Sequence, residues 1–94
     1  MSQEGAVEAA KRLIAEDGFF EERKFASASE LPALINQTAN CCAATRVRNE
    51  FFVIEWRVSV VAEKGNQRLV SNMTLSNCGA IFSGTRFQII EARR

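Results

Sequence analysis

Histidine is absent from this chain, and its absence limits the acid–base and nucleophilic chemistry that the sequence could support. Ser–His and Cys–His nucleophile systems are excluded, because both need an imidazole to take the proton. The remaining candidates are the thiols of Cys41, Cys42 and Cys78 and the carboxylate of Glu55. The sequence therefore favours a non-enzymatic function.

The three cysteines do not form a metal-binding pattern. No C-x-x-C occurs and histidine is missing, so we predict no metal and no cofactor. Adjacent cysteines rarely pair because the ring that they close is strained, so we expect Cys41 and Cys42 not to be bonded to each other. A bridge from either of them to Cys78 is geometrically possible. A reactive thiol needs an electropositive setting, which Arg46 could supply, whereas the simpler interpretation is that these small residues fill a packed strand.

Glu55 is the carboxylate most closely surrounded by opposite charge. Arg57 lies on the same side of an extended strand, and Arg68 is expected across a hairpin. A catalytic base would need a pocket that raises its pKa, whereas an ion pair on a solvated sheet face needs none, so we favour the ion pair. We predict that this face carries the binding residues, which are Glu55, Arg57, Arg68, Asn72, Arg86 and Gln88.

The elements that position these residues begin with a helix over about residues 3–17. Ser2 can cap its start, and Gly18 is the residue type that ends helices. One apolar stripe recurs at helical spacing and consists of Ala6, Val7, Ala10, Leu13 and Ile14. Residues 19–26 are expected to be irregular, with three aromatic side chains against the core, Phe19, Phe20 and Phe25. The capping-box pattern of residues 27–30 then predicts a short second helix.

From about residue 40 the spacing of apolar residues changes from helical to extended. Residues 41–48 fit a first strand, Asn49-Glu50 a turn, and residues 51–63 the clearest strand in the chain. Alternate side chains of that strand are apolar and are expected on one covered face, namely Phe52, Ile54, Trp56, Val58, Val60 and Ala62. This alternation is typical of an antiparallel sheet that is covered on one side only.

The rest of the chain predicts a meander. Residues 64–67 form a hairpin loop, residues 68–77 a return strand, and residues 80–91 a last strand that Ser83-Gly84 interrupts with a bulge. The fold class is therefore α+β. An N-terminal helix and a short second helix pack on a curved antiparallel sheet of three to four strands, as in cystatin-like and NTF2-like folds. The 94 residues form a single domain, 1–94.

The charge distribution bears on the partner. The net charge is +1, but residues 1–45 carry four basic and seven acidic residues, whereas residues 46–94 carry eight basic and four acidic ones. A basic second half can indicate an anionic partner, although the arginines are spread out, so we favour mutual neutralisation within one fold. No apolar stretch approaches the length of a membrane span and no signal peptide is visible, so we expect no membrane partner and a cytoplasmic location.

Residues 6–19 form an amphipathic helix that leads into Gly and an aromatic residue. In this respect the chain resembles NTF2-fold immunity proteins of bacterial toxin systems, whose first helix ends in a pattern like Phe/Leu-Ile-x-x-Asn-Gly-Tyr. The matching positions are Leu13, Ile14 and Gly18. Asp17 and Phe19 stand where Asn and Tyr are usual, and the Thr-Asp-x-Pro-Pro that often follows is missing. The strand pattern of residues 53–58 suits the family's sheet. The resemblance implies a toxin-neutralising binder without catalysis.

Three functions are compatible with these residues. The leading one is a non-enzymatic protein-binding module that engages another protein, or a second copy as a homodimer, through its sheet face and edges. The second is a small-ligand-binding or enzymatic NTF2-like domain, with a pocket between the first helix and the sheet lined by Phe19, Phe20 and Trp56. The third is a nucleic-acid binder that uses the basic sheet face; we rank it last because the aromatics are expected on the opposite face.

Overall fold

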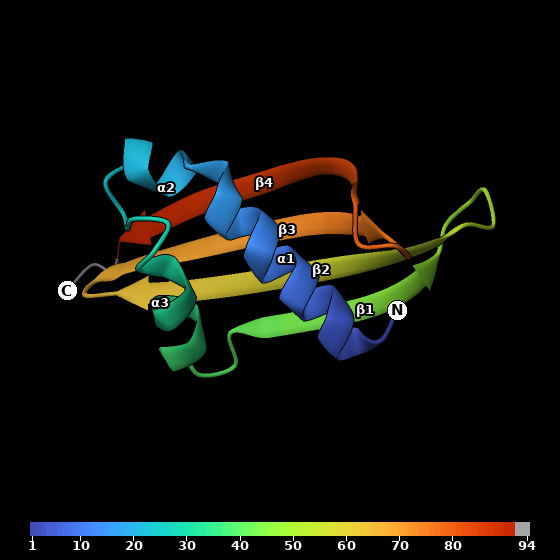
Figure 1. The fold of residues 1–94 in the computed structure, drawn as a ribbon, viewed down its shortest axis with the longest axis horizontal. Helices are drawn as coiled ribbons and strands as arrows, with labels where there is room; N and C mark the ends of the chain where they lie inside the picture. The colour runs from blue at the N-terminus through green and yellow to red at the C-terminus, as the bar shows by residue number, and fades with distance from the viewer. Residues whose placement is uncertain (92–94) are drawn as a thin grey trace.

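The computed structural model describes residues 1–91, without the side chains of 82–85, and shows an α+β fold with helices on one side of a single sheet (Figure 1). The predicted fold class is confirmed. The elements in chain order are α1 (Gln3–Asp17), α2 (Phe19–Glu22), α3 (Leu31–Gln37), β1 (Cys42–Arg48), β2 (Ile54–Lys64), β3 (Gln67–Ser76) and β4 (Ile81–Glu91).

The sheet is an antiparallel meander in the order β1-β2-β3-β4. The predicted hairpin joins β2 and β3, but its loop is shorter than the predicted 64–67, because Lys64 and Gln67 pair with each other as strand residues. The register between β3 and β4 shifts near Ser83, which confirms the predicted interruption of the last strand. The prediction for the second strand is wrong at its start, because β2 begins at Ile54 and not at residue 51.

Helix α1 forms as its local signals predict. The side chain of Ser2 accepts a hydrogen bond from the amide of Gly5 at 3.0 Å, and Gly18 ends the helix with a φ of 75°. The buried side of the helix consists of Ala6, Ala9, Ala10 and Ile14. These small residues let the helix cross the sheet diagonally at close range, from β1 towards β4 (Figure 1).

Residues 19–22 form a one-turn helix, α2, where the sequence predicted an irregular segment. The aromatic packing expected there is present: Phe20 and Phe25 are buried, and the ring of Phe19 stacks on that of Phe87 with centroids 5.1 Å apart. These contacts stabilise a turn too short to persist alone. The turn therefore depends on β4, which is more than sixty residues away in sequence.

Helix α3 starts behind the predicted capping box. The amide of Glu30 donates to Ser27 Oγ at 3.2 Å, and the amide of Ser27 donates to Glu30 Oε2 at 3.4 Å. Glu30 also accepts from Lys64 Nζ at 3.2 Å, which ties the start of α3 to the end of β2. The bond from Lys64, and after it the bond from Ser27, hold the pKa of the Glu30 carboxyl below its ordinary value of 4.5.

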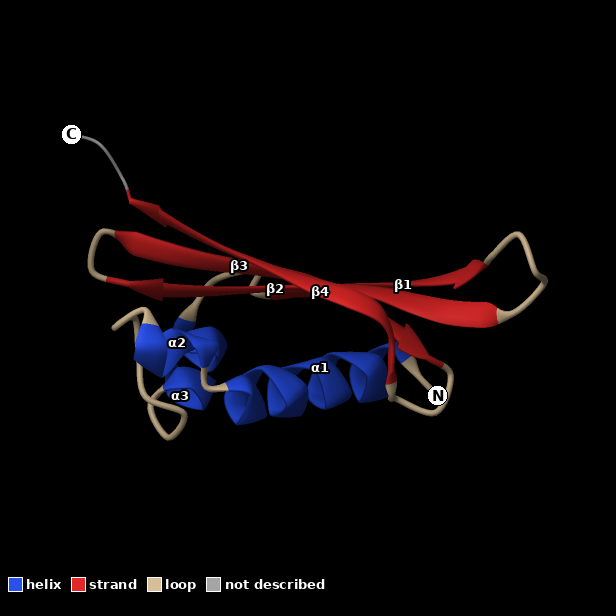
Figure 2. Ribbon diagram, turned by 90° about the horizontal axis from the view of Figure 1, so that it is seen from above, coloured by secondary structure: helices blue, strands red, loops and turns tan. Residues whose placement is uncertain are grey.

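All three helices lie on the same side of the sheet, so its other side is uncovered (Figure 2). The core lies between the two layers and includes Trp56, Val58, Leu69 and Leu75, each at most 5% exposed. The prediction that β2 places Trp56 on the covered face is confirmed. One side of the meander is thus committed to packing, and the reverse side is available for contact.

Candidate functional site

The uncovered side of the sheet carries all six residues that the sequence predicted for binding. Pairing across the strands places the sites of Arg57, Asn72 and Arg86 on one side, opposite to the helices. Glu55, Arg68 and Gln88 fall on the same side by the two-residue period of a strand. Five of the six are exposed, the exception being Glu55. We call this side, with the side chains named here, the outer face.

Rows across the strands fix which residues of the outer face are neighbours. Asn72 pairs with Ser59 on one side and with Arg86 on the other. Arg68 pairs with Glu63 and Ile90, so it does not lie opposite Glu55 as the sequence analysis expected. Glu55 instead pairs with Ser76 on β3 and Val47 on β1. The two residues lie at opposite ends of the hairpin, because Arg68 follows the closing pair Lys64–Gln67 by one residue and Glu55 precedes it by nine.

Glu55 forms an ion pair with its own strand neighbour. Arg57 Nη2 lies 3.3 Å from Glu55 Oε1, and the arginine side chain is 63% exposed while that of the glutamate is 9% exposed. The expectation of a solvated ion pair is therefore wrong for the carboxylate, which is largely removed from water. The guanidinium remains at the surface, where it can contact an anionic group of a partner.

The loop between β1 and β2 presents two phenylalanine rings to solvent. Phe51 is 75% exposed and Phe52 is 81% exposed, so the prediction that Phe52 lies on the covered face is wrong. The side chain of Asn49 accepts hydrogen bonds from the amides of Phe51 and Val53 at 2.9 and 3.1 Å. Phe52 has a φ of 60°, a left-handed conformation that is costly for a bulky residue. The loop thus has a defined conformation that holds the rings in water.

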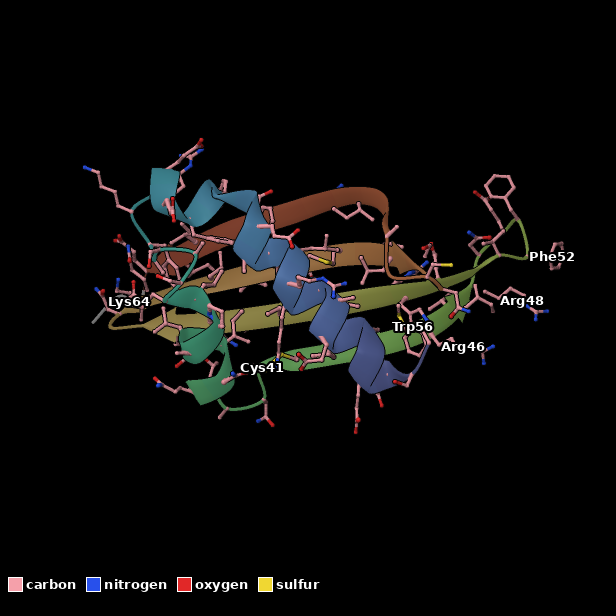
Figure 3. The ribbon with its side chains drawn as sticks, viewed as in Figure 1. Cys41, Arg46, Arg48, Phe52, Trp56 and Lys64 are labelled. Atoms are coloured by element: carbon pink, nitrogen blue, oxygen red, sulfur yellow. A yellow bond between two sulfur atoms is a disulfide. The ribbon has the colours of Figure 1, made fainter. Side chains whose placement is uncertain are left out.

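The phenylalanine loop, residues 49–53, extends the outer face at one end. It rises from the sheet on the side away from the helices (Figure 2). Phe52 points outward at that end, with Arg46 and Arg48 nearby on β1 and Lys64 at the opposite end of the molecule (Figure 3). The sequence placed residues 51 and 52 in the strand because the alternation of apolar residues in β2 extends back to Phe52. The turn predicted at Asn49-Glu50 is present, and the side chain of Asn49 extends it by binding the amides of Phe51 and Val53.

The expected ligand pocket is not lined by the three aromatic residues assigned to it. Phe19 and Phe20 pack against Phe87 near the end of α1, with ring centroids 5.1 and 5.2 Å from it. Trp56 lies at the opposite end of the sheet, where its Nε1 donates to Asn77 Oδ1 at 3.0 Å (Figure 3). Phe20 and Trp56 are both buried in the core. Their rings serve packing and do not converge on one cavity.

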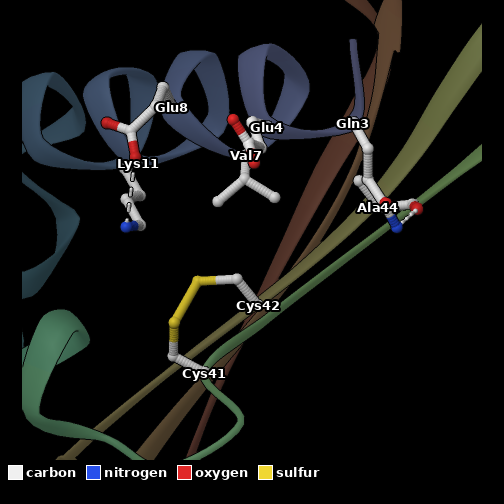
Figure 4. A pocket seen from close by; sticks show the side chains of 8 residues that line it. All are labelled: Gln3, Glu4, Val7, Glu8, Lys11, Cys41, Cys42 and Ala44. Atoms are coloured by element: carbon white, nitrogen blue, oxygen red, sulfur yellow. Dashed lines mark hydrogen bonds and ion pairs between the residues drawn. A yellow bond between two sulfur atoms is a disulfide. The ribbon is translucent and has the colours of Figure 1, made fainter.

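A groove of about 330 Å³ does lie between α1 and β1 (Figure 4). Its lining residues are Gln3, Glu4, Val7, Glu8, Lys11, Cys41, Cys42 and Ala44. Cys41 and Cys42 are bonded to each other in its wall, so the expectation that these neighbours do not pair is wrong. Cys78 is a free, exposed thiol in the turn before β4. The close approach of α1 to the start of β1 creates this groove.

Chemical features beyond these are few within residues 1–91. No three metal-ligating side chains converge in that part of the chain. None of its helices is long and apolar enough to cross a membrane. Comparisons with models of protein families, with curated proteins and with solved structures found no match for the chain.

Proposed function

We propose that this protein is a non-enzymatic binding module that engages a partner protein through the outer face of its sheet. The observation that carries the proposal is the phenylalanine loop: two rings held in solvent by an ordered loop, at the end of a face that the helices leave uncovered. Aromatic residues, Phe among them, and arginine are enriched at protein interfaces relative to the rest of the surface.

The size of the outer face supports a role for the loop. Four strands spaced about 4.8 Å apart and about ten residues long offer roughly 600 Å² of surface. A stable interface covers about 800 Å² on each partner. The phenylalanine loop extends this surface at one end of the sheet with two largely exposed rings. The loop also adds apolar surface to that of Val70 and Ile90, which lie among the polar residues of the outer face.

The charge of the outer face indicates the kind of partner. Arg57, Arg68 and Arg86 lie on it with Glu55 and Glu63, and Glu55 is already paired with Arg57. This surplus of arginine favours an acidic partner surface, which would also steer association. The most concrete version is neutralisation of a toxin in the cytoplasm, as the resemblance of the first helix to immunity proteins suggests.

Charge reversal on the outer face provides the test. Arg68→Glu/Arg86→Glu removes two of the arginines without disturbing the Glu55–Arg57 pair, and Phe51→Ser/Phe52→Ser removes the rings. The matched control is Arg12→Glu/Lys24→Glu, which reverses two exposed charges on the helical layer. Proteins retained from the source organism are compared on all four immobilised forms, and the products of neighbouring genes are tested directly for toxicity and binding.

The proposal expects one protein that the unmodified chain and the control retain and that both outer-face variants lose. Each variant should weaken binding by more than tenfold, since hot-spot residues cost about 2 kcal/mol or more when they are truncated and a tenfold loss corresponds to about 1.4 kcal/mol. A partner that binds all four forms equally would contradict the proposed surface. Sedimentation of the chain alone decides whether that partner is a second copy, because a homodimer would dissociate in the outer-face variants.

A nucleic-acid partner is the second candidate, and one observation favours it more than the sequence did. Phe51 and Phe52 are both exposed, and Phe52 lies near Arg46 and Arg48, so a ring that can stack on bases does lie beside basic side chains. They stand at one end and are not interleaved with the arginines of the outer face. Retention on a polyanion column that falls steeply with salt would favour this candidate over the protein partner.

A further inference from the structure

The bonded pair Cys41–Cys42 lies where a small molecule can reach it. Both residues are half-buried, and they form part of the wall of the groove between α1 and β1 (Figure 4). The groove measures about 330 Å³. A cavity of about 150 Å³ is enough to hold benzene. The groove can therefore admit a small thiol to the disulfide, which an interior disulfide would not allow.

Acidic side chains dominate the charge of this groove. Glu4 and Glu8 line it together with Lys11. Lys11 Nζ lies 3.3 Å from Glu8 Oε1 and donates to Asn36 Oδ1 at 3.1 Å, so the ammonium group is already engaged. Glu4 has no such cation among the described ion pairs. The groove thus keeps one unbalanced negative charge, which attracts a cation and repels an anion.

We propose that Cys41–Cys42 is a reversible thiol–disulfide exchange site, selective for small thiols that carry a positive charge. The proposal is independent of the outer face, because the groove lies on the helical side of the sheet. It uses the one bonded sulfur pair of the described residues, which the binding function does not employ.

The exchange balances in two steps. The thiolate of a first small thiol attacks one sulfur of the pair, which forms a mixed disulfide and releases the other cysteine as a thiolate that takes up a proton. A second small thiol attacks the mixed disulfide at the sulfur of the small molecule. The products are one small-molecule disulfide and two protein thiols, so two electrons pass from the two small thiols to the protein. A small disulfide drives the reverse reaction.

Three reductants of different charge test the proposal in a Cys78→Ser background, which removes the free thiol. Cysteamine is cationic, 2-mercaptoethanol is neutral and 2-mercaptoethanesulfonate is anionic. The oxidised protein is mixed with each reductant, and samples are quenched with N-ethylmaleimide at intervals. The mass of the intact protein is then measured by mass spectrometry, and each free thiol adds the mass of one label. Rates are divided by the thiolate concentration of each reductant.

Full reduction should add two labels, and re-oxidation with cystamine should abolish both and leave no bound cysteamine in the intact mass, because closure of the pair releases it. We expect the cationic thiol to react roughly fivefold faster than the neutral one at low salt, and the difference to shrink at about 0.15 M salt. Glu4→Gln/Glu8→Gln should remove this preference. Glu16→Gln, which changes an exposed carboxylate of α1 outside the groove, should keep it.

Two results would overturn the proposal. Two labels on protein that has been incubated with cystamine would show that the pair does not close. Rates that are independent of reductant charge, or unchanged by Glu4→Gln/Glu8→Gln, would show that the groove does not select the thiol. Neither result bears on the outer face, so a failure here is distinguishable from a failure of the binding function.

Discussion

A buried hydroxyl group offers the sharpest test of how this fold is stabilised. Ser71 lies at the centre of β3 on the covered face and is fully buried. Its Oγ has no hydrogen-bond partner within the part of the chain that the structure describes. A hydroxyl in that position has lost its hydrogen bonds to water without replacing them. We therefore expect Ser71→Ala to stabilise the protein.

The magnitude follows from two opposing terms. Burying a hydroxyl without a partner costs about 1–3 kcal/mol in proteins. Removing the oxygen leaves a space of roughly 12 Å³, which at about 24 cal/mol per Å³ costs roughly 0.3 kcal/mol. The desolvation term is larger, so the free energy of unfolding should rise by about 1–2 kcal/mol. With a denaturant slope of about 1 kcal/mol per M, the urea midpoint should rise by about 1–2 M.

Urea unfolding followed by tryptophan fluorescence measures this shift, because Trp56 is the single tryptophan of the chain and is 5% exposed. Thr38→Val is the matched control. Thr38 is also a buried hydroxyl residue, but its Oγ1 donates to Leu34 O at 2.7 Å and accepts from the amide of Glu63 at 3.0 Å. Its replacement leaves those groups unpaired and should lower the free energy of unfolding by about 1–3 kcal/mol.

The two substitutions remove one buried oxygen each and are expected to have opposite signs. A loss of stability in Ser71→Ala would falsify the assignment of an unpaired hydroxyl and would show that the oxygen is satisfied in solution. Equal effects of the two substitutions would show that hydrogen bonding does not decide the outcome at either position.

Three further predictions each concern a single residue. Trp56→Phe removes the indole bond to Asn77 and should lower the free energy of unfolding by about 1 kcal/mol, measured by thermal melting in circular dichroism; an unchanged melting temperature would contradict it. Gly18→Ala forces a side chain into a left-handed conformation with open space around it, so backbone strain alone should cost about 1–2 kcal/mol, and a stabilised variant would refute this. Because the pKa of Glu30 is lowered by Lys64, its contribution to stability is present above pH 4.5 and is lost as the pH falls through the lowered value. NMR titration should show this low pKa, and Lys64→Met should return it towards 4.5.

Local signals in the sequence determined α1, α3 and the two sides of the sheet, whereas α2 was predicted to be irregular. The cap at Ser2, the stripe of small apolar residues and Gly18 lie within one stretch of chain, so they predicted α1 to its ends. The two-residue period of β2 placed Trp56 on the covered face and Glu55 and Arg57 on the outer face. The same period in β3 and β4 placed the other predicted binding residues on the outer face. Period and capping act between near neighbours, and a sequence displays them directly.

Other features, on which the proposed functions rest, were decided by specific side-chain contacts and by tertiary structure. The position of Phe52 follows from hydrogen bonds of the Asn49 side chain, which end the strand alternation before residue 54. The burial of Glu55 follows from its neighbours on β1 and β3, and the groove around Cys41–Cys42 follows from the approach of α1 to the edge strand. The burial of Glu55 and the groove depend on contacts between segments that are distant in sequence. The position of Phe52 depends on a side chain that accepts hydrogen bonds from backbone amides in place of a neighbouring strand. A periodic pattern predicts which side of the sheet a residue faces, but it does not predict which side chains contact the residue on that side.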